Sequence, residues 1–398
     1  MVEYPADWKW RTLGSCATVK ARIGWQGLTT AEYLKDGDHY LVNGVNIENG
    51  QVNWQTCFMV DEKRYAQDKN IQLQNFDVLV SKDGTIGKVA YVENMPRTAT
   101  LNSGVFVIRS VDAELSQEYL ARVFLSTWFD AFIKKITAGS TIVHLYQKDI
   151  VQFSFQIPPL PEQKRIAAVL SNADKLIANV EKQIAKKRAI KQGAMQELLT
   201  GKKRLPGFSG EWRSLYLGSI ADIRTGKRNG DEQKTDGMYP FFVRSQSVYR
   251  IDSYSYDGEA IIIPGEGGIG SIFHYINGRF DFHQRVYKVS DFPCNISCQY
   301  VYYYMKQFFG KYALQNTVKA TVDSLRLPTF QNFTVNMPAS LDEQQAIAKV
   351  LSGMDAEIAN LERKLEKLKL IKQGMMQDLL TGKVRLKQNP ETRKERRT

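Results

Sequence analysis

The sequence contains few cysteines and few histidines. Only four of each occur in 398 residues, which is too few cysteines for a disulfide scaffold of this size. Cys294 and Cys298 are four residues apart, and His283 is the single other plausible ligand near them. Since a zinc site needs two close-spaced ligand pairs, we expect no bound metal and thiols that are buried or idle.

The sequence also has no long apolar run. No segment reaches the roughly 18 apolar residues of a membrane span, and residues 1–10 lack the basic and apolar regions of a secretory signal. We therefore expect a cytoplasmic protein with no membrane partner. A composition of 43% hydrophobic and 11% aromatic residues supplies real cores and excludes a disordered basic protein. The length suggests two or three domains, and the net charge of +12 suggests a nucleic-acid partner.

Motifs of catalytic chemistry are missing as well. Residues 265–270 match G-x-G-x-x-G, but a strand-like alternation follows where a dinucleotide-binding helix would begin. We interpret this run, and residues 83–88 in the first half, as tight turns between strands. No Asn/Asp-Pro-Pro-aromatic motif for adenine methylation occurs, and the triplet from Glu162 lacks the second acidic residue of a metal nuclease. We expect no catalytic residue in this chain.

What the sequence does contain is an internal repeat. Residues 160–205 align with residues 341–386 at a constant offset of 181, and 27 of the 46 pairs are identical. This level of identity indicates a duplication, so the fold should have two halves. Each copy has apolar residues three and four apart and a glycine after its end, Gly201 or Gly382. The pattern predicts a helix of about 39 residues, or roughly 58 Å.

The segments around the repeat, 1–159 and 206–340, resemble each other only weakly. Both have strand character, with short helices expected near residues 116–135 and 299–312. The fold class expected is therefore α+β, with two mixed α/β domains separated by two long helices. An antiparallel pair within the chain is the simplest arrangement of those helices, because a large domain lies between them. An ordinary core or oligomerisation coiled coil is the alternative.

Several of these motifs together resemble the specificity subunits of type I restriction–modification systems, the HsdS family. The resemblance rests on the segment PPLPEQ from Pro158, the segment QELLTG from Gln196, their second copies, and the Trp-x-x-x-x-Leu-Gly openings at Trp8 and Trp212. The turns GTIGK from Gly84 and PGEG from Pro264 contribute to it, and it covers essentially the whole chain. The second copy departs slightly, because it lacks the proline run.

The resemblance implies a division into five segments. Residues 1–159 and 206–340 would be target recognition domains 1 and 2, each reading one half of a bipartite, asymmetric double-stranded DNA target. Residues 160–205 and 341–386 would be the central and C-terminal helical spacers, paired as an antiparallel coiled coil with pseudo-two-fold symmetry that sets the spacing. Residues 387–398 would be a basic tail.

The resemblance also implies partners. Two methyltransferase subunits would carry out adenine methylation, and two restriction/translocase subunits would complete the nuclease. S-adenosylmethionine, ATP and Mg²⁺ would bind in those partners and no cofactor in this chain, which would be non-catalytic. Two other classes stay open: a coiled-coil adaptor or scaffold without DNA specificity of its own, and an enzyme whose site is assembled in space within the variable domains.

Polar loop residues are the candidate DNA contacts, since base edges are read by paired donors and acceptors. The clusters TGKRNG from Thr225 and VRSQSVYR from Val243 are stronger candidates than single positions. In the first domain the candidates are Lys20, Arg22, Gln26, Asn43, Asn46, Ser81, Lys82, Asn102, Ser103, Ser140, Thr141, His144 and Tyr146. In the second they are Arg224, Lys227, Arg228, Arg244, Ser245, Gln246, Arg250, His283, Gln284, Arg285, Lys319 and Thr321.

The excess positive charge lies mostly outside these domains. Residues 160–205 carry +7 and residues 387–398 carry +3, whereas residues 1–159 and 206–340 carry −1 and +2. The charged helix either attracts the phosphates of the unread spacer DNA or is a solvated face. In both cases sequence specificity should come from local loops, and methyltransferase subunits should supply much of the binding affinity for DNA.

Overall fold

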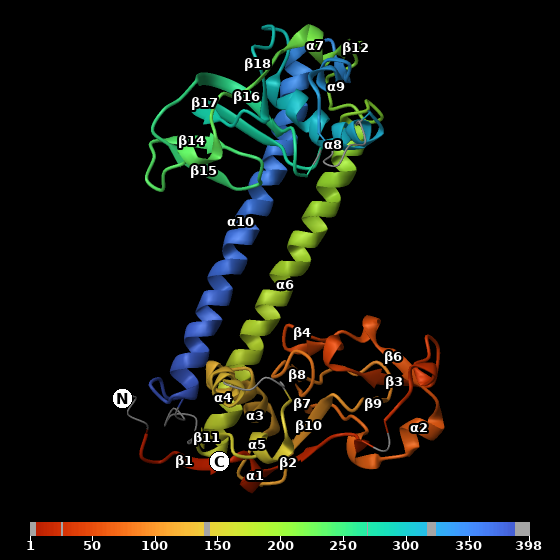
Figure 1. The fold of residues 1–398 in the computed structure, drawn as a ribbon, viewed down its shortest axis with the longest axis vertical. Coiled ribbons are helices and arrows are strands. Elements are labelled where there is room, and N and C mark those ends of the chain that lie inside the picture. The colour runs from red at the N-terminus through yellow and green to blue at the C-terminus, as the bar shows by residue number, and fades with distance from the viewer. Residues whose placement is uncertain (1–4, 25–26, 139–143, 269, 317–323, 387–398) are drawn as a thin grey trace, which may run out of the picture. The chain divides into compact units, whose positions relative to one another are not determined.

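A computed structural model describes residues 5–24, 27–138, 144–268, 270–316 and 324–386 (Figure 1). Its contacts divide the chain into two compact units: unit 1 is Met1–Asn179 with Leu365–Thr398, and unit 2 is Val180–Lys364. The division falls within the two long helices, α6 (Leu160–Leu198) and α10 (Leu341–Leu380), so each unit holds part of both. Their lengths of 39 and 40 residues confirm the helices predicted from the repeat.

Unit 1 is built from short strands and short helices. Its strands are β1 (Lys9–Thr12), β2 (Ala17–Lys20), β3 (His39–Val42), β4 (Ile47–Glu48), β5 (Gln51–Val52), β6 (Phe58–Val60), β7 (Val78–Ser81), β8 (Val89–Tyr91), β9 (Ala99–Leu101), β10 (Val105–Ser110) and β11 (Ser154–Ile157). Its helices besides the long ones are α1 (Leu13–Cys16), α2 (Glu62–Ala66), α3 (Gln117–Phe124), α4 (Thr127–Thr137) and α5 (Gln147–Ile150), with 3₁₀ turns η2 (Thr30–Glu32), η3 (Gly44–Asn46), η4 (Trp54–Thr56) and η5 (Lys69–Ile71).

Unit 2 has fewer and longer elements. Its strands are β12 (Trp212–Tyr216), β13 (Asp222–Thr225), β14 (Tyr239–Phe242), β15 (Val248–Ile251), β16 (Tyr256–Pro264), β17 (His274–Phe282), β18 (Val286–Ser290) and β19 (Thr334–Pro338). Its other helices are α7 (Leu217–Ile220), α8 (Cys298–Asn316) and α9 (Leu327–Gln331), with the 3₁₀ turn η6 (Gly230–Glu232).

The two units share one strand topology. Unit 2 has a six-stranded sheet in the order β13-β18-β16-β17-β14-β15. In unit 1 the corresponding strands follow the same order but form two sheets, β2-β10-β7-β8 and β6-β3-β9. The division arises because two separate strands, β8 and β9, stand where unit 2 has the single strand β17. Pro96 and the left-handed Asn94 (φ +51°) lie between β8 and β9, and both residues oppose a continuous strand.

The turns confirm the interpretation of the glycine runs. β7 pairs antiparallel with β8, and β16 with β17, so a strand follows each run. Gly84 and Gly87 in the first turn, and Gly267 and Gly268 in the second, all have positive φ, a conformation that favours glycine. The helix expected near residues 116–135 is two helices, α3 and α4, and the helix expected near 299–312 is α8.

The ends of the long helices belong to the cores of the units. In unit 1, Ile166 and Leu170 of α6 pack into the same buried cluster as Leu379 and Leu380 of α10. The equivalent residues in the unit 2 core are Leu198, Leu199, Ile347 and Leu351. Burial of such side chains is the main stabilising contribution available to each unit.

In each unit, a buried ion pair connects the start of one long helix to an arginine that follows the other long helix. In unit 1, Arg385 donates to Glu162 through Nε (2.9 Å) and Nη2 (2.7 Å), and the Glu162 side chain is only 3% exposed. In unit 2, Arg204 donates in the same way to Glu343, through Nε (2.5 Å) and Nη2 (2.6 Å). Burial opposes ionisation of Glu162, but the hydrogen bonds from Arg385 and from the Leu386 N–H outweigh it and lower the pKa.

The glutamine after each glutamate ties the helix to its domain. Gln163 accepts from the Ser116 N–H (2.8 Å) and donates to the Glu114 and Pro158 carbonyls (2.7 and 2.8 Å). Gln344 accepts from the Ser297 N–H (2.9 Å) and donates to two carbonyls in the same pattern. Both amides are fully buried, so each bond satisfies a group that water cannot reach.

Ion pairs also connect the two helices within each unit. In unit 1, Lys372 of α10 pairs with Asp174 of α6 (2.5 Å). In unit 2, Lys191 of α6 pairs with Asp355 of α10 (2.5 Å), and Lys187 pairs with Glu357 (2.6 Å). The Lys191 side chain is 10% exposed, so Asp355 supplies the opposite charge where little water can reach the ion pair.

We predict that Arg385→Ala destabilises unit 1, because it leaves the Glu162 carboxylate buried without its cation. The expected loss is about 3 kcal/mol or more in the free energy of unfolding, measured by urea denaturation. Because the folded pKa of Glu162 is depressed, the stabilisation is present above the ordinary pKa of about 4.3. It is lost as the pH falls through the folded value, so the wild-type advantage should shrink in acid.

The matched control is Lys383→Ala. Lys383 pairs with Asp378 (3.1 Å) with a side chain that is 73% exposed, so this substitution should cost less than about 1 kcal/mol. Equal stability of the two variants at neutral pH would contradict the importance assigned to the buried pair.

Candidate nucleic-acid interface

In unit 1, loops from separate strands meet at one place. The unit 1 loop cluster consists of Asn43 after β3, Lys82 and Asp83 after β7, Asn102 after β9, and His144. Asn102 donates to the side chain of Asn43, and Asp83 pairs with His144. β3 and β9 are parallel neighbours, so their carboxyl ends fall together.

Backbone hydrogen bonds hold this cluster in place. The Lys82 N–H donates to the Gly104 carbonyl (2.9 Å), and the Leu145 N–H donates to the Lys82 carbonyl (2.9 Å). Lys82 also lies over the Phe106 ring, with Nζ 5.5 Å from its centroid. The cluster is therefore a preformed polar surface, made of the residue types that pair with base edges.

Three candidates of the first domain lie in the interior instead. Arg22 is 2% exposed and donates to the Leu101 carbonyl (2.8 Å) and to the hydroxyl of Thr100 (3.2 Å). Asn46 and Ser81 are buried and bond to nearby backbone. These side chains support the loops, and burial lowers the pKa of Arg22.

The other candidates of the first domain divide into two groups. Lys20 and Tyr146 are exposed, and Ser103 is partly exposed beside Asn102. Gln26, Ser140 and Thr141 lie outside the described residues.

In unit 2, loops from separate strands also meet at one place. The unit 2 loop cluster consists of Lys227 after β13, Arg244 after β14, Glu266 after β16, and Gln284 with Arg285 before β18. Glu266 accepts from Arg285 Nη1 (2.6 and 2.8 Å) and from Arg244 Nη1 (3.3 Å). Hydrogen bonds from both arginines, that of Arg285 the stronger, hold the pKa of Glu266 below its ordinary value.

His283 supports the unit 2 loop cluster from beneath. It is 7% exposed, and its Nδ1 accepts from the Arg285 N–H (3.0 Å). Burial, and then the charges of Arg244 and Arg285, lower the pKa of His283. A neutral imidazole at physiological pH has the free acceptor nitrogen that this bond requires.

Several candidates of the second domain have partners within the protein. Arg228 pairs with Asp281 (3.1 Å) and Glu232 (2.9 Å), and Arg250 donates to the Gly237 carbonyl (2.8 Å). Arg224 is exposed beside Asp222. Gln246 is exposed and Ser245 is partly exposed, whereas Lys319 and Thr321 lie outside the described residues.

Sequence reasoning missed the acidic and aromatic members of the clusters. Asp83 and Glu266 organise the basic and polar side chains around them, Tyr33 accepts from Asn102 (2.6 Å), and Asn229 accepts from Gln284 (2.7 Å). Asp83 and Glu266 each follow the end of a buried strand, in the two turns that were already singled out. That position was the available signal, since carboxylates also pair with base edges.

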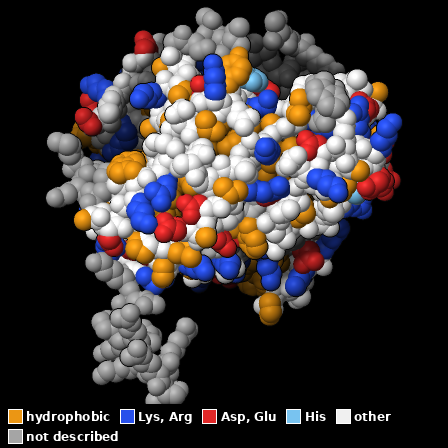
Figure 2. Space-filling model, turned by 90° about the horizontal axis from the view of Figure 1, so that it is seen from below, with side chains coloured by type: hydrophobic (Ala, Val, Ile, Leu, Met, Phe, Trp, Pro, Cys, Tyr) orange, Lys and Arg blue, Asp and Glu red, His pale blue; other side chains and the backbone are white. Residues whose placement is uncertain are grey.

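On the face drawn in Figure 2, the described residues form no single basic patch. Lys and Arg side chains are interspersed there with Asp and Glu. This pattern agrees with the nearly neutral net charge of residues 1–159.

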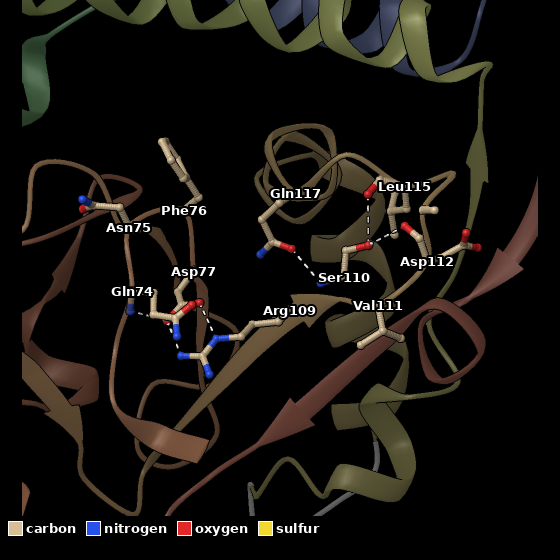
Figure 3. Close-up of a pocket in the computed structure, with 11 residues that line it drawn as sticks. Gln74, Asn75, Phe76, Asp77, Arg109, Ser110, Val111, Asp112, Leu115 and Gln117 are labelled. Atoms are coloured by element: carbon tan, nitrogen blue, oxygen red, sulfur yellow. Dashed lines mark hydrogen bonds and ion pairs between the residues drawn. The ribbon is translucent and has the colours of Figure 1, made fainter. Parts of the chain in front are cut away.

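A separate hollow of about 560 Å³ lies in unit 1, away from the loop cluster (Figure 3). Arg109 in it forms a two-point ion pair with the buried Asp77 (2.6 and 2.7 Å). Phe76 at its rim is half exposed and has φ +78°. β10 runs antiparallel to β7, with Ile108 opposite Val78 and Val105 opposite Ser81, so the hollow is at the other end of these strands.

Among the described residues, no group of three or more His, Cys, Asp or Glu side chains could hold a metal ion. In the same part of the chain, no helix is long and apolar enough to cross a membrane.

We predict that Arg22→Ala lowers the free energy of unfolding by about 2 kcal/mol, because buried acceptors lose their donor. The neighbouring exposed Lys20→Ala should change it by less than about 0.5 kcal/mol. Urea unfolding followed by tryptophan fluorescence distinguishes the two. An Arg22→Ala variant with wild-type stability would contradict the supporting role.

Comparison with known proteins identifies relatives of both units. The protein-family model described as Type I restriction modification DNA specificity domain matches residues 5–187 and 209–370. The type I restriction enzyme MjaVIII specificity subunit of Methanocaldococcus jannaschii is 26% identical over 291 residues, which are 65% of this chain and 68% of that protein. The MjaX specificity subunit of the same organism is 24% identical over 429 residues, covering 97% and 95% of the two chains.

Solved structures share the fold. A type I restriction–modification system S subunit from M. genitalium has a TM-score of 0.65 and 16% identity, covering 94% of this chain and 96% of that one. A chain from a structural study of assembly and conformational transition of the type I R-M system has a TM-score of 0.55 and 18% identity, covering 96% and 100%.

Proposed function

This chain belongs to the family of type I restriction–modification DNA specificity subunits, and we propose that each of its two units reads one half of a bipartite DNA target. One observation supports this most directly: the family model matches the chain twice, once over residues 5–187 and once over 209–370. Each match includes one of the two loop clusters. The chain thus carries a DNA specificity role in two copies.

The different side chains of the two clusters support an asymmetric target. In the loops that follow equivalent strands, β3 and β14 or β7 and β16, unit 1 has Asn43 and Asp83, whereas unit 2 has Arg244 and Glu266. Amide groups and guanidinium groups pair with different bases. The two halves of the target should therefore differ in sequence.

We also propose that α6 and α10 pair as an antiparallel coiled coil that sets the number of unread base pairs between the halves. The ion pairs support it: within unit 2, Lys187 and Lys191 of α6 pair with Glu357 and Asp355 of α10, so partner numbers fall as α6 advances. A helix of about 58 Å is long enough to separate two readers by one DNA turn of roughly 34 Å.

The proposal extends to partners. The chain would join two methyltransferase subunits and two restriction/translocase subunits, with S-adenosylmethionine, ATP and Mg²⁺ bound in those partners. The duplicated Glu-Arg and Gln contacts build two equivalent units, and two equivalent units offer two equivalent docking surfaces. The specificity subunit itself would be non-catalytic.

Long-read methylation mapping with and without the gene tests this function directly. We expect a bipartite motif with methylated adenines that disappears with the gene. Binding of duplex DNA, with and without methyltransferase subunits, should weaken as salt rises. A genome whose methylation does not depend on the gene would contradict the proposal.

We predict that removing one helical turn changes the spacer and preserves both half-sites. The matched change deletes residues 183–186 of α6 together with residues 360–363 of α10, which shortens each helix by about 6 Å. Methylation mapping should return the same halves with a spacer that is one or two base pairs shorter.

The control replaces with alanine the seven of these eight residues that are not already alanine, which keeps the length and should keep the spacing. If the deletion variant instead methylates altered half-sites at the original spacing, the helices do not set the distance between the half-sites.

We further predict that the purified single chain neither methylates nor cleaves DNA when S-adenosylmethionine, ATP and Mg²⁺ are added. Methylation activity should appear when methyltransferase subunits are added. Turnover by the single chain, retained after further purification, would contradict a non-catalytic role.

A further inference from the structure

Arg244 and Arg285 differ from the other basic residues of the unit 2 loop cluster because one carboxylate holds them together. Both Nη1 atoms bond Oε2 of Glu266, at 3.3 and 2.6 Å. The two nitrogens are therefore less than about 6 Å apart, which corresponds to one or two base-pair steps of roughly 3.4 Å. The arginine side chains are 50% and 54% exposed, whereas that of Glu266 is 20% exposed.

Hydrogen bonds also hold the backbone around these three residues in place. The Gly265 N–H donates to the Arg285 carbonyl (2.8 Å), and the Leu325 N–H donates to the Gly265 carbonyl (2.8 Å). The Ser245 carbonyl lies 3.3 Å from His274 Nε2, which fixes the segment after Arg244. Such preorganisation lowers the entropy cost of placing the guanidinium groups on a ligand.

Each guanidinium keeps one edge for a ligand. In the part of the chain that the structure describes, the hydrogen bonds of both groups run through Nη1. The edge formed by Nε and Nη2 remains, and it presents two parallel N–H donors. The O6 and N7 atoms of guanine are the pair of acceptors in the DNA major groove that match this fork.

The carboxylate favours base edges over phosphates as the ligand. Glu266 cancels one of the two positive charges, and a phosphate near both arginines would also face that carboxylate. A neutral base edge meets no such repulsion. Lys227, exposed on the neighbouring loop, is better suited to a phosphate because its charge is uncompensated among the described residues.

We propose that Arg244 and Arg285, oriented by Glu266, each read a guanine, so that the half-site of unit 2 contains two G·C pairs within two steps of each other. This inference rests on the proposed function, because it requires the unit 2 loop cluster to face DNA. By strand register and backbone hydrogen bonds, the equivalent positions of unit 1 hold Gly44, Asp83 and Gly104. The half-site of unit 1 should therefore lack this dependence on arginine.

The test uses the complete complex, with the chain co-expressed with its methyltransferase subunits, and maps methylated sequences for Arg244→Ala, Arg285→Ala and Arg285→Lys. Each variant should relax one G·C pair in one half-site by roughly ten- to a hundred-fold. The other half-site and the spacing should stay unchanged, which also shows that the variant folds. Arg285→Lys should relax as well, because it keeps the charge and loses the fork.

The matched control is Arg279→Ala. Arg279 is half exposed and pairs with Asp257 (2.9 Å) at the start of β16, the far end of that strand from Glu266. This variant should keep the wild-type motif.

Two results would overturn the inference while leaving the proposed function intact. One is a bipartite motif that no arginine variant changes. The other is uniform weakening on all sequences, with a salt-dependence slope reduced by about one, which indicates a phosphate contact. If the wild-type complex methylates no bipartite motif at all, that result would instead contradict the proposed function itself.

Discussion

The structure depends on a buried carboxylate in the first turn of each long helix. Glu162 and Glu343 are almost completely shielded from water, so their charge has to be matched inside the protein. The arginine that matches each one follows the other long helix: Arg385 for Glu162 and Arg204 for Glu343. The glutamine after each glutamate then binds the backbone of the adjoining domain. One dipeptide in each copy of the repeat thus joins two helices and a domain into one unit.

The two units show how one topology carries two surfaces. The strand order is the same in both, and the loop residues at equivalent positions differ. The cores are built from the strands, the shorter helices and the ends of the long helices, whereas the residues of the loop clusters lie outside them. Substitution in a loop therefore leaves most of the buried apolar area untouched. The loop surface can therefore differ between units that fold in the same way.

The structure brings loops predicted from the sequence together, but it places some of the predicted single residues in the interior. The clusters from Thr225 and Val243 include Lys227 and Arg244, which lie in the unit 2 loop cluster. Arg22 and Ser81 are of the same polar types but point into the interior, where backbone carbonyls accept from them. Composition and position do not distinguish a side chain that faces water from one that satisfies a buried carbonyl, because both need a polar group in a loop.

The sequence alone determined the two long helices, the duplication and the strand-to-strand character of the glycine turns. These features depend on residues close in the chain: a three-and-four spacing of apolar side chains, and glycines where φ must be positive. Tertiary structure decided which polar side chains meet, since Arg244, Glu266 and Arg285 come from three separate loops. It also decided the role of the helix-start glutamates, because their arginine partners lie 139 and 223 residues away. No local pattern encodes contacts at that separation.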